Sequence, residues 1–238
     1  MRVSSTEVQN NFGKYLKLAE ANEEIIVTRN GKDIAKIVRC EPETVKEEAE
    51  VYRTSGEWVT YEEFLELVEN SEQRFELIDG VVYYMVSPTY KHQMVVGELL
   101  AVFRTWFKGK PCAALTSPFD VTLVKSADNI CVVQPDIVVL CDKENIDDQG
   151  RYKGVPTLVV EVLSPGTRGK DLLKKLNLYH ECGIREYWIV DPEQETITIY
   201  AFEGEETVEH RVYTPAQETA ASLIFEGLAV SMKDAFSD

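Results

Sequence analysis

The hydrophobic pattern of the first forty residues predicts one helix followed by a β-hairpin. Ser4 and Glu7 have the spacing of a capping box, which marks the start of a helix. Apolar side chains then recur at helical spacing; they are Val8, Phe12, Tyr15, Leu16 and Ala19. Asn30-Gly31 follows between two apolar runs, a typical hairpin signal because a type I′ turn needs positive φ at both positions. Such a unit has a small core, so residues 1–40 are expected to dimerise or to dock.

The pattern changes after residue 40. Residues 41–56 are rich in Glu, poor in apolar side chains and end in Ser-Gly, which predicts a linker, in part helical. Residues 57–238 predict a second, larger domain. The elements expected there are helix 61–69 with Thr60 as its cap, a hairpin around Asp79-Gly80, helix 87–107, strands 119–124, 132–140 and 158–163, helix 169–182, strand 187–191 and a hairpin over 195–213. This order predicts a mixed α/β (α+β) fold with one central sheet.

Charge is distributed unevenly along the chain. The protein has 41 acidic and 25 basic residues, and its net charge of −16 argues against a simple nucleic-acid binder, because phosphate contacts need Lys and Arg. Residues 1–40 hold seven basic and five acidic residues, whereas the remaining chain holds 18 and 36. The first forty residues therefore differ in kind from the rest.

The cysteines and the hydropathy favour a cytoplasmic protein. Five cysteines show no C-x-x-C spacing, so we expect neither a thiolate metal site nor a framework of disulfides. No apolar run has the roughly 20 residues of a membrane helix, and the first residues lack the apolar core of a signal peptide. We therefore expect a reducing cytoplasm and no membrane segment.

Three carboxylates lie within apolar runs of the larger domain. Glu76 lies in RFELIDG, Asp136 in VVQPDIVVL and Glu161 in LVVEVL. A carboxylate in an aliphatic strand is costly unless its charge is compensated, and crowded carboxylates repel one another. A divalent cation reverses this balance, and hard oxygen ligands suit Mg²⁺ or Mn²⁺. Taken singly, each acid is explained as well by an ion pair with Arg or Lys, or by a solvent-facing strand edge.

The helix expected after Glu161 brings a lysine towards this acid. At about 100° per residue, Asp171, Lys175 and Tyr179 are spaced i, i+4 and i+8 and share a face. Lys175 lies at the border of the apolar side and can reach inward, whereas Lys174 points away and is expected in solvent. The alternative for the trio is an ordinary ion pair on the helix surface.

In combination these residues resemble the PD-(D/E)-x-K nuclease superfamily. Pro135-Asp136 corresponds to the PD motif and Glu161 to the second acid. The lysine expected two residues later is absent, since position 163 is Leu, but a subset of the superfamily places it on the next helix, where Lys175 lies. From about residue 60 to the C-terminus the chain is similar to the Uma-two family of restriction endonucleases. The shared motifs are Phe75-Glu76-Leu77-Ile78-Asp79-Gly80, Ser87-Pro88 with His92, Pro135-Asp136, Val160-Glu161-Val162-Leu163-Ser164-Pro165, Asp171 with Lys175 and Tyr179, and Glu186-Tyr187-Trp188-Ile189-Val190-Asp191-Pro192.

The resemblance implies a restriction-endonuclease-like fold and a Mg²⁺- or Mn²⁺-dependent endonuclease that hydrolyses phosphodiester bonds in nucleic acid, preferentially DNA. Asp136, Glu161 and Glu76 would bind the cation. Lys175 would complete the catalytic set by orienting a water or stabilising charge on the phosphate. Three further residues are expected near the substrate; they are His92, Tyr179 and Asp171. A structural histidine and a packed tyrosine are the alternatives for the first two.

The N-terminal segment resembles the DNA-binding module of the Phd/YefM antitoxins. The shared features are Asn11-Phe12-Gly13 and Glu24-Ile25-Ile26-Val27-Thr28-Arg29-Asn30-Gly31-Lys32. The resemblance implies that residues 1–40 dimerise and bind operator DNA, which makes the protein a homodimer or a higher even oligomer. The alternative is a dimerisation module that touches no DNA. The toxin-binding tail of those antitoxins is not recognisable, so a toxin partner is left open.

Two functional interpretations follow. In the first, the protein is an endonuclease guided or regulated by an antitoxin-like module, and the complete set of three acids and a lysine favours it. In the second, it is a non-catalytic antitoxin-like DNA-binding regulator whose nuclease-like domain only binds a partner, and the acidic composition favours it. A phosphodiesterase that acts on RNA or on a nucleotide is a third alternative.

Overall fold

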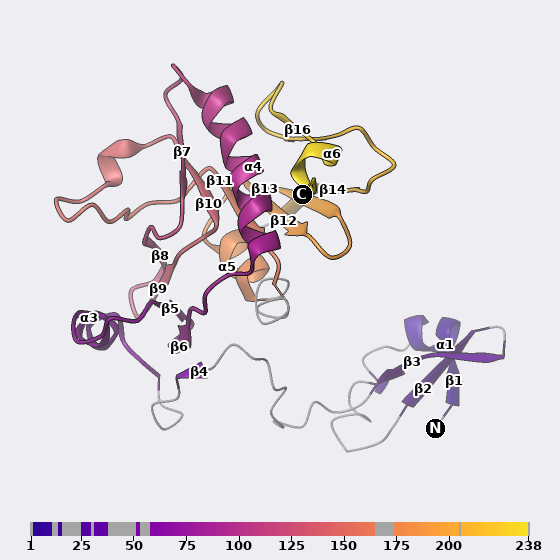
Figure 1. Ribbon diagram of the computed structural model, residues 1–238. Helices are drawn as coiled ribbons and strands as arrows, with labels where there is room; N and C mark the ends of the chain where they lie inside the picture. The colour runs from indigo at the N-terminus through magenta and orange to yellow at the C-terminus, as the bar shows by residue number, and fades with distance from the viewer. Residues whose placement is uncertain are drawn as a thin grey trace. The chain divides into compact units, whose positions relative to one another are not determined.

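The computed structural model divides the chain into two compact units, Met1–Lys46 and Glu47–Asp238 (Figure 1). The structure describes residues 2–10, 14–15, 25–29, 31–37, 51–52, 58–164, 174–204 and 206–237. Within these ranges, no helix has both the length and the apolar character that crossing a membrane requires.

The first unit contains a three-stranded sheet. β1 (Arg2–Ser4) runs parallel to β2 (Ile25–Arg29), and β2 pairs with antiparallel β3 (Lys32–Ile37). β2 and β3 form the hairpin that the sequence predicts, with φ of +75° at Gly31. The buried core of this unit consists of Val3, Val8, Tyr15, Ile25 and Val27.

One short helix of this unit follows β1. α1 (Ser5–Asn10) starts as predicted, because the Ser4 hydroxyl accepts a hydrogen bond from the Glu7 N–H at 3.2 Å. Four residues of the predicted pattern lie outside the described residues; they are Phe12, Leu16, Ala19 and Asn30.

A six-stranded mixed sheet forms the centre of the second unit. Its order is β14-β13-β12-β11-β10-β7. In this order the strands span Glu206–Tyr213, Thr196–Glu203, Glu186–Asp191, Leu158–Val162, Ile137–Leu140 and Ala113–Thr116. β11 and β12 run parallel, whereas the other neighbouring pairs are antiparallel. The central strands are buried along their whole length, which requires cover on both faces.

Two helices contribute to that cover. α4 (Tyr90–Phe107) crosses one face of the sheet and shares a core with Val160 of β11 (Figure 1). α5 (Leu176–Glu181) lies on the other face, where Leu178 shares a core with Val159. Because successive strand residues point to opposite faces, Glu161 is directed towards the α5 side.

A second sheet has the order β4-β6-β5-β9-β8. These strands span Val51–Tyr52, Val81–Tyr84, Phe75–Ile78, Asn129–Val133 and Val121–Ser126. α3 (Tyr61–Glu69) packs against it and is capped by Thr60, as predicted. Asp79 and Gly80 have φ of +48° and +69°, which fits the predicted turn between β5 and β6. β4 lies within the segment that the sequence predicts to be a linker.

The single strand predicted over residues 132–140 is two strands that belong to different sheets. β9 ends at Val133, and β10 begins at Ile137. Pro135 lies between them; it has no N–H to donate and restricts the residue before it, so a hydrogen-bonded ladder does not continue through it. The central mixed sheet is confirmed, but the prediction that all strands join it is wrong.

Several elements were not predicted. They are β1, β7, the 3₁₀ turn η1 (Lys143–Asn145), β15 (Thr219–Ala221), β16 (Ala229–Ser231) and α6 (Met232–Ala235). They are short, and the β7 sequence AALT contains two alanines, which are depleted in strands.

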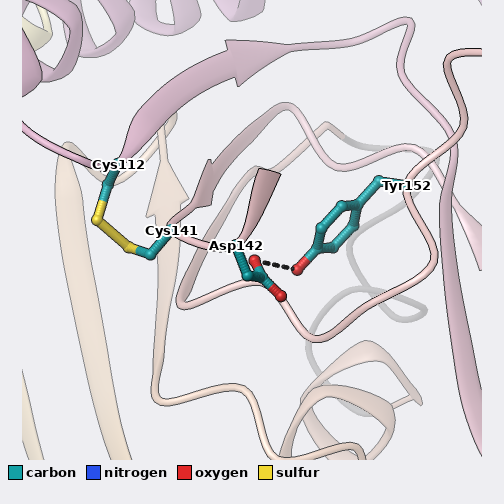
Figure 2. The surroundings of a disulfide bond; sticks show 4 residues. All are labelled: Cys112, Cys141, Asp142 and Tyr152. Carbon is teal, nitrogen blue, oxygen red and sulfur yellow. Dashed lines mark hydrogen bonds between the residues drawn. A yellow bond between two sulfur atoms is a disulfide. The ribbon is translucent and has the colours of Figure 1, made fainter. Parts of the chain in front are cut away.

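Cys112 and Cys141 form a disulfide with an S–S distance of 2.06 Å (Figure 2). The cysteine spacing did not predict it. β7 and β10 are antiparallel, and Ala113 lies opposite Leu140. One step beyond this pair, Cys112 therefore lies opposite Cys141. Because a disulfide is the exception in a reducing compartment, the cysteines no longer support the prediction of a reducing cytoplasm.

Candidate functional site

The three predicted acids lie where the two sheets are joined. Glu76 is on β5, Asp136 is in the link between β9 and β10, and Glu161 is on β11. In the antiparallel pairing of β10 and β11, Ile137 lies opposite Val160, so one further step places Asp136 opposite Glu161. Strand pairing therefore brings together two acids that are distant in the sequence.

Glu161 is buried and binds two side chains from the α5 segment. Only 4% of this residue is exposed. Its Oε1 accepts hydrogen bonds from Lys175 Nζ at 2.7 Å and from the Tyr179 hydroxyl at 2.6 Å. Lys175 and Tyr179 thus share a face, as their spacing predicts, and Lys175 points inward. Asp171, the third member of that pattern, lies outside the described residues.

The ammonium group of Lys175 also contacts Glu76. Lys175 Nζ lies 2.9 Å from Glu76 Oε1, and the Gln134 N–H donates to the same oxygen at 3.0 Å. Glu76 has no exposed surface. Two buried carboxylates therefore share one ammonium group, which offsets part of the cost of burying them.

Asp136 is oriented by a backbone amide and a histidine. Its Oδ2 accepts a hydrogen bond from the Val162 N–H at 2.8 Å and lies 3.2 Å from His92 Nε2. His92 lies in the first turn of α4, where the Thr89 hydroxyl accepts its N–H at 3.3 Å. The Asp136 side chain is 18% exposed. It is therefore the most accessible acid of the three.

Tyr179 holds Glu161 from inside the protein. Burial raises the pKa of Tyr179 well above 10, and the charge of Glu161 raises it further. The hydroxyl therefore stays protonated at neutral pH and remains a donor. Tyr179 has no exposed surface and its hydroxyl contacts Glu161, which fits the packed tyrosine given as the alternative in the sequence analysis; a contact with substrate stays a prediction.

Two polar residues beside the site were not among the predicted site residues. Gln134 is buried, and its Nε2 donates to Asp120 Oδ1 at 2.8 Å. Its position directly before the PD motif is the signal that could have indicated it. Lys174 is exposed, as predicted, but its Nζ donates to the Tyr83 hydroxyl at 2.8 Å.

The donor set fits a hard divalent cation in its chemistry. Asp136 and Glu161 present carboxylate oxygens from adjacent segments, the ligands that Mg²⁺ and Mn²⁺ prefer. Among the residues that the structure describes, no three His, Cys, Asp or Glu side chains already form a metal-binding group. Instead, the Lys175 ammonium supplies the compensating positive charge to Glu76 and Glu161.

A central mixed sheet with a helix on each face, two opposed acids and an adjoining lysine define a restriction-endonuclease-like nuclease fold. Residues 61–233 match the Uma2 family model, described as "Putative restriction endonuclease". The chain therefore belongs to the Uma2 family, and the resemblance to the Uma-two proteins is confirmed.

Two similar proteins extend this comparison. The crystal structure of "a putative nuclease belonging to DUF820" from Anabaena variabilis matches with a TM-score of 0.60 and 23% identity, over 75% of this chain and 97% of that chain. An uncharacterized protein of Synechocystis sp. is 29% identical over 140 residues, which cover 58% of this chain and 72% of that protein. The first match shows that the fold is shared.

The N-terminal segment matches a different family. Residues 1–42 match the model described as "Antitoxin Phd_YefM, type II toxin-antitoxin system". The resemblance to the Phd/YefM antitoxins is therefore confirmed over these residues.

Proposed function

We propose that the protein is a metal-dependent endonuclease that hydrolyses phosphodiester bonds in nucleic acid, with DNA as the preferred substrate. The observation that supports this best is the hydrogen bond from Lys175 to Glu161, which lies opposite Asp136. Three separate segments thereby present two acids and a lysine at one place. Membership of the Uma2 family supports the same conclusion.

The residues of the site have distinct roles in this proposal. Asp136 is held by the Val162 N–H, and Glu161 is held by the Tyr179 hydroxyl. These contacts keep two carboxylates in fixed orientations, so little reorganisation is needed when a substrate binds. Lys175 stabilises negative charge on the phosphate or orients the attacking water.

Mg²⁺ or Mn²⁺ is the proposed cofactor, with Asp136, Glu161 and Glu76 as its ligands. When bound, such a cation polarises the phosphate and lowers the pKa of a coordinated water. In the hydrolysis the water oxygen bonds to phosphorus and one phosphorus–oxygen ester bond breaks. The leaving oxygen takes a proton, so that one water is consumed for each bond cleaved.

The N-terminal unit is proposed to guide or regulate the nuclease by dimerising and binding DNA. Its match to the antitoxin family supports this role. Light scattering of the purified protein should give the mass of an even number of chains, and a single-chain mass would contradict dimerisation. A toxin partner is a separate proposal that rests on the antitoxin match alone.

The decisive experiment compares the wild-type protein with Glu161→Ala on supercoiled plasmid and on single-stranded RNA, in Mg²⁺, Mn²⁺ or EDTA. We expect metal-dependent cleavage that the substitution abolishes. Isothermal titration with Mn²⁺ should show binding that disappears in the Asp136→Ala/Glu161→Ala double variant. Unchanged binding in the double variant would contradict the metal assignment.

A non-catalytic regulator is the second candidate function. The observation that favours it is the net charge of −16, because contacts with phosphate need Lys and Arg. In that case the domain binds a partner without cleaving it. The wild-type protein and Glu161→Ala would then both leave plasmid and RNA intact under every metal condition. A DNA mobility shift would persist with both proteins.

A further inference from the structure

A cavity of about 570 Å³ lies at the C-terminal end of α4. Its walls include Arg104, Lys108 and Lys110 from the end of α4 and the turn that follows, Lys143 from η1, and the strand β7. We call it the basic pocket. Among the residues that the structure describes, no carboxylate lines it, and none of the candidate site residues described above takes part in it.

The four cations of the basic pocket are exposed, and within the described part of the chain none of them forms an ion pair. Lys110 Nζ lies over the Trp106 ring, 2.8 Å from its centroid. In a protein with a net charge of −16, this cavity is a local concentration of positive charge. A cleft lined by one sign of charge focuses the electric field and attracts the opposite charge.

The disulfide between Cys112 and Cys141, drawn in Figure 2, adjoins the basic pocket. Cys112 lines the pocket, and Cys141 leads through Asp142 to Lys143. The Asp142 carboxylate is turned to other partners, because it accepts hydrogen bonds from the Tyr152 hydroxyl at 2.7 Å and from Asn145 Nδ2 at 2.6 Å. The acid that precedes Lys143 is therefore engaged away from the pocket.

We propose that the basic pocket binds the phosphodiester backbone of the nucleic acid whose cleavage is proposed above, and this inference rests on that function. Exposed lysines bind one small phosphate weakly, because water and salt screen each ion pair. A polyanion binds more tightly, since neutralising several phosphates releases their condensed counterions. Four exposed cations in one cavity therefore fit a nucleic-acid strand better than a single phosphate.

The distance to the acids fits the same strand. Asp136 directly precedes β10, and Cys141 directly follows it. Five residues of extended chain span about 17 Å. Along one strand of a duplex, with one phosphate per 3.4 Å of axis, this corresponds to about five nucleotides. A strand bound at the acids would therefore have to extend about five nucleotides further to reach Cys141, which is bonded to the pocket residue Cys112.

The test measures binding of full-length protein to a labelled duplex DNA and to a labelled single-stranded RNA in EDTA, over a series of salt concentrations. The test variant is Lys108→Gln/Lys110→Gln/Lys143→Gln, and the matched control is Arg185→Gln/Arg211→Gln/Lys233→Gln, which removes the same charge from exposed positions outside the pocket. The test variant should bind at least about tenfold more weakly at low salt, with a salt slope shallower by two to three (~0.9 per lost phosphate contact).

The control variant should retain its affinity within about twofold, since none of its three positions lines the basic pocket. All proteins keep the N-terminal unit, so its contribution to binding is common to them. If the triple variant fails to fold by circular dichroism, Arg104→Glu alone should show the same weakening. Equal losses in the test and control variants would overturn the proposal.

Inorganic phosphate serves as the competitor that tests for a small-anion site. Phosphate and chloride are each titrated until they displace the same fraction of nucleic acid from the wild-type protein. If phosphate does so at a far lower concentration than chloride, the pocket binds a small anion and the backbone assignment is wrong. Because binding is measured in EDTA, the result does not depend on cleavage. Loss of cleavage in Glu161→Ala and loss of binding in the pocket variant therefore test the two proposals separately.

Discussion

Glu161 and Glu186 are two buried glutamates on the parallel neighbours β11 and β12, and their partners differ in kind. Glu161 binds the charged Lys175 and the Tyr179 hydroxyl. Glu186 accepts four neutral donors at 2.6 to 3.0 Å. These donors are the Trp188 indole N–H, the Ser222 hydroxyl and the backbone N–H groups of Leu223 and Ile224.

The difference shows that a carboxylate inside an apolar strand does not by itself indicate catalysis. Glu186 accepts hydrogen bonds from the donors of a turn in the C-terminal segment, and these bonds attach that segment to the sheet. Glu161 instead lies opposite a second acid and holds a lysine that also contacts a third. Charged partners and crowding of acids distinguish a candidate site from a structural carboxylate.

The largest effect is expected when each glutamate is replaced by its amide. Glu161→Gln removes a charge from the reacting centre and should lower cleavage of nucleic acid by about a thousandfold. Glu186→Gln should leave the rate per folded molecule within about twofold of the wild type, because no proposed catalytic group touches it. Rates would be measured on plasmid in Mg²⁺, normalised to the folded fraction. Equal losses in both variants would remove the distinction between the two acids.

The second largest effect is expected when cleavage is compared between variants of two adjacent lysines. Lys175→Met should reduce cleavage by about a hundredfold while sparing Mn²⁺ affinity, because the ammonium proposed to stabilise charge on the phosphate is lost. Lys174→Met is the matched control, since Lys174 is exposed and contacts Tyr83 instead. Single-turnover rates and titration calorimetry would measure both. A larger loss of cleavage in Lys174→Met than in Lys175→Met would contradict the assignment of Lys175 as the catalytic lysine.

A smaller effect is expected on stability. Glu186→Gln should lower the free energy of unfolding by about 2 kcal/mol, because at least one donor of the C-terminal turn loses its acceptor. Urea denaturation followed by tryptophan fluorescence would measure the change. Asp234→Asn on the exposed side of α6 serves as a carboxylate-to-amide control and should change stability little. An unchanged Glu186→Gln protein would show that water replaces the lost acceptor.

The smallest effect concerns pH. Burial raises the pKa of Glu186 above its ordinary value of 4.5, although four hydrogen bonds oppose the shift. The folded state therefore holds the carboxyl proton of Glu186 more tightly than the unfolded state. The contribution of this proton to the free energy of unfolding is complete below pH 4.5, and it is lost as the pH rises through the pKa of the folded state. Urea denaturation between about pH 4 and pH 7 should show the stability difference between wild type and Glu186→Gln narrowing with pH. A difference that widens would contradict the raised pKa.

The strongest local signals of the sequence correspond to elements of the structure. α3 follows its Thr60 cap, the turn at Asp79-Gly80 has positive φ, and β11 contains Glu161 as predicted. These features depend on neighbouring residues, so a local pattern is sufficient to predict them. The inward direction of Lys175 followed from helical phase for the same reason.

The errors arose where the answer depends on partners that are distant in the sequence. Pro135 at the centre of the run 132–140 is a local signal for a break in the strand, but it does not indicate that the two halves join different sheets. β7 is short and weakly patterned, so the facing positions of Cys112 and Cys141 were not predictable. The basic pocket was missed because Lys143 comes from a segment distant in the sequence from Arg104, Lys108 and Lys110.

The sequence alone determined which chemical groups are available: three acids in apolar runs, a lysine in helical phase with a tyrosine, and an N-terminal segment of different charge. Only the tertiary structure decided which of these groups meet. The register of β10 and β11 places Asp136 opposite Glu161, and the link between the two sheets brings Glu76 to Lys175. Local sequence fixes backbone conformation over a few residues, whereas contacts between distant segments depend on strand order and register, which no local period contains.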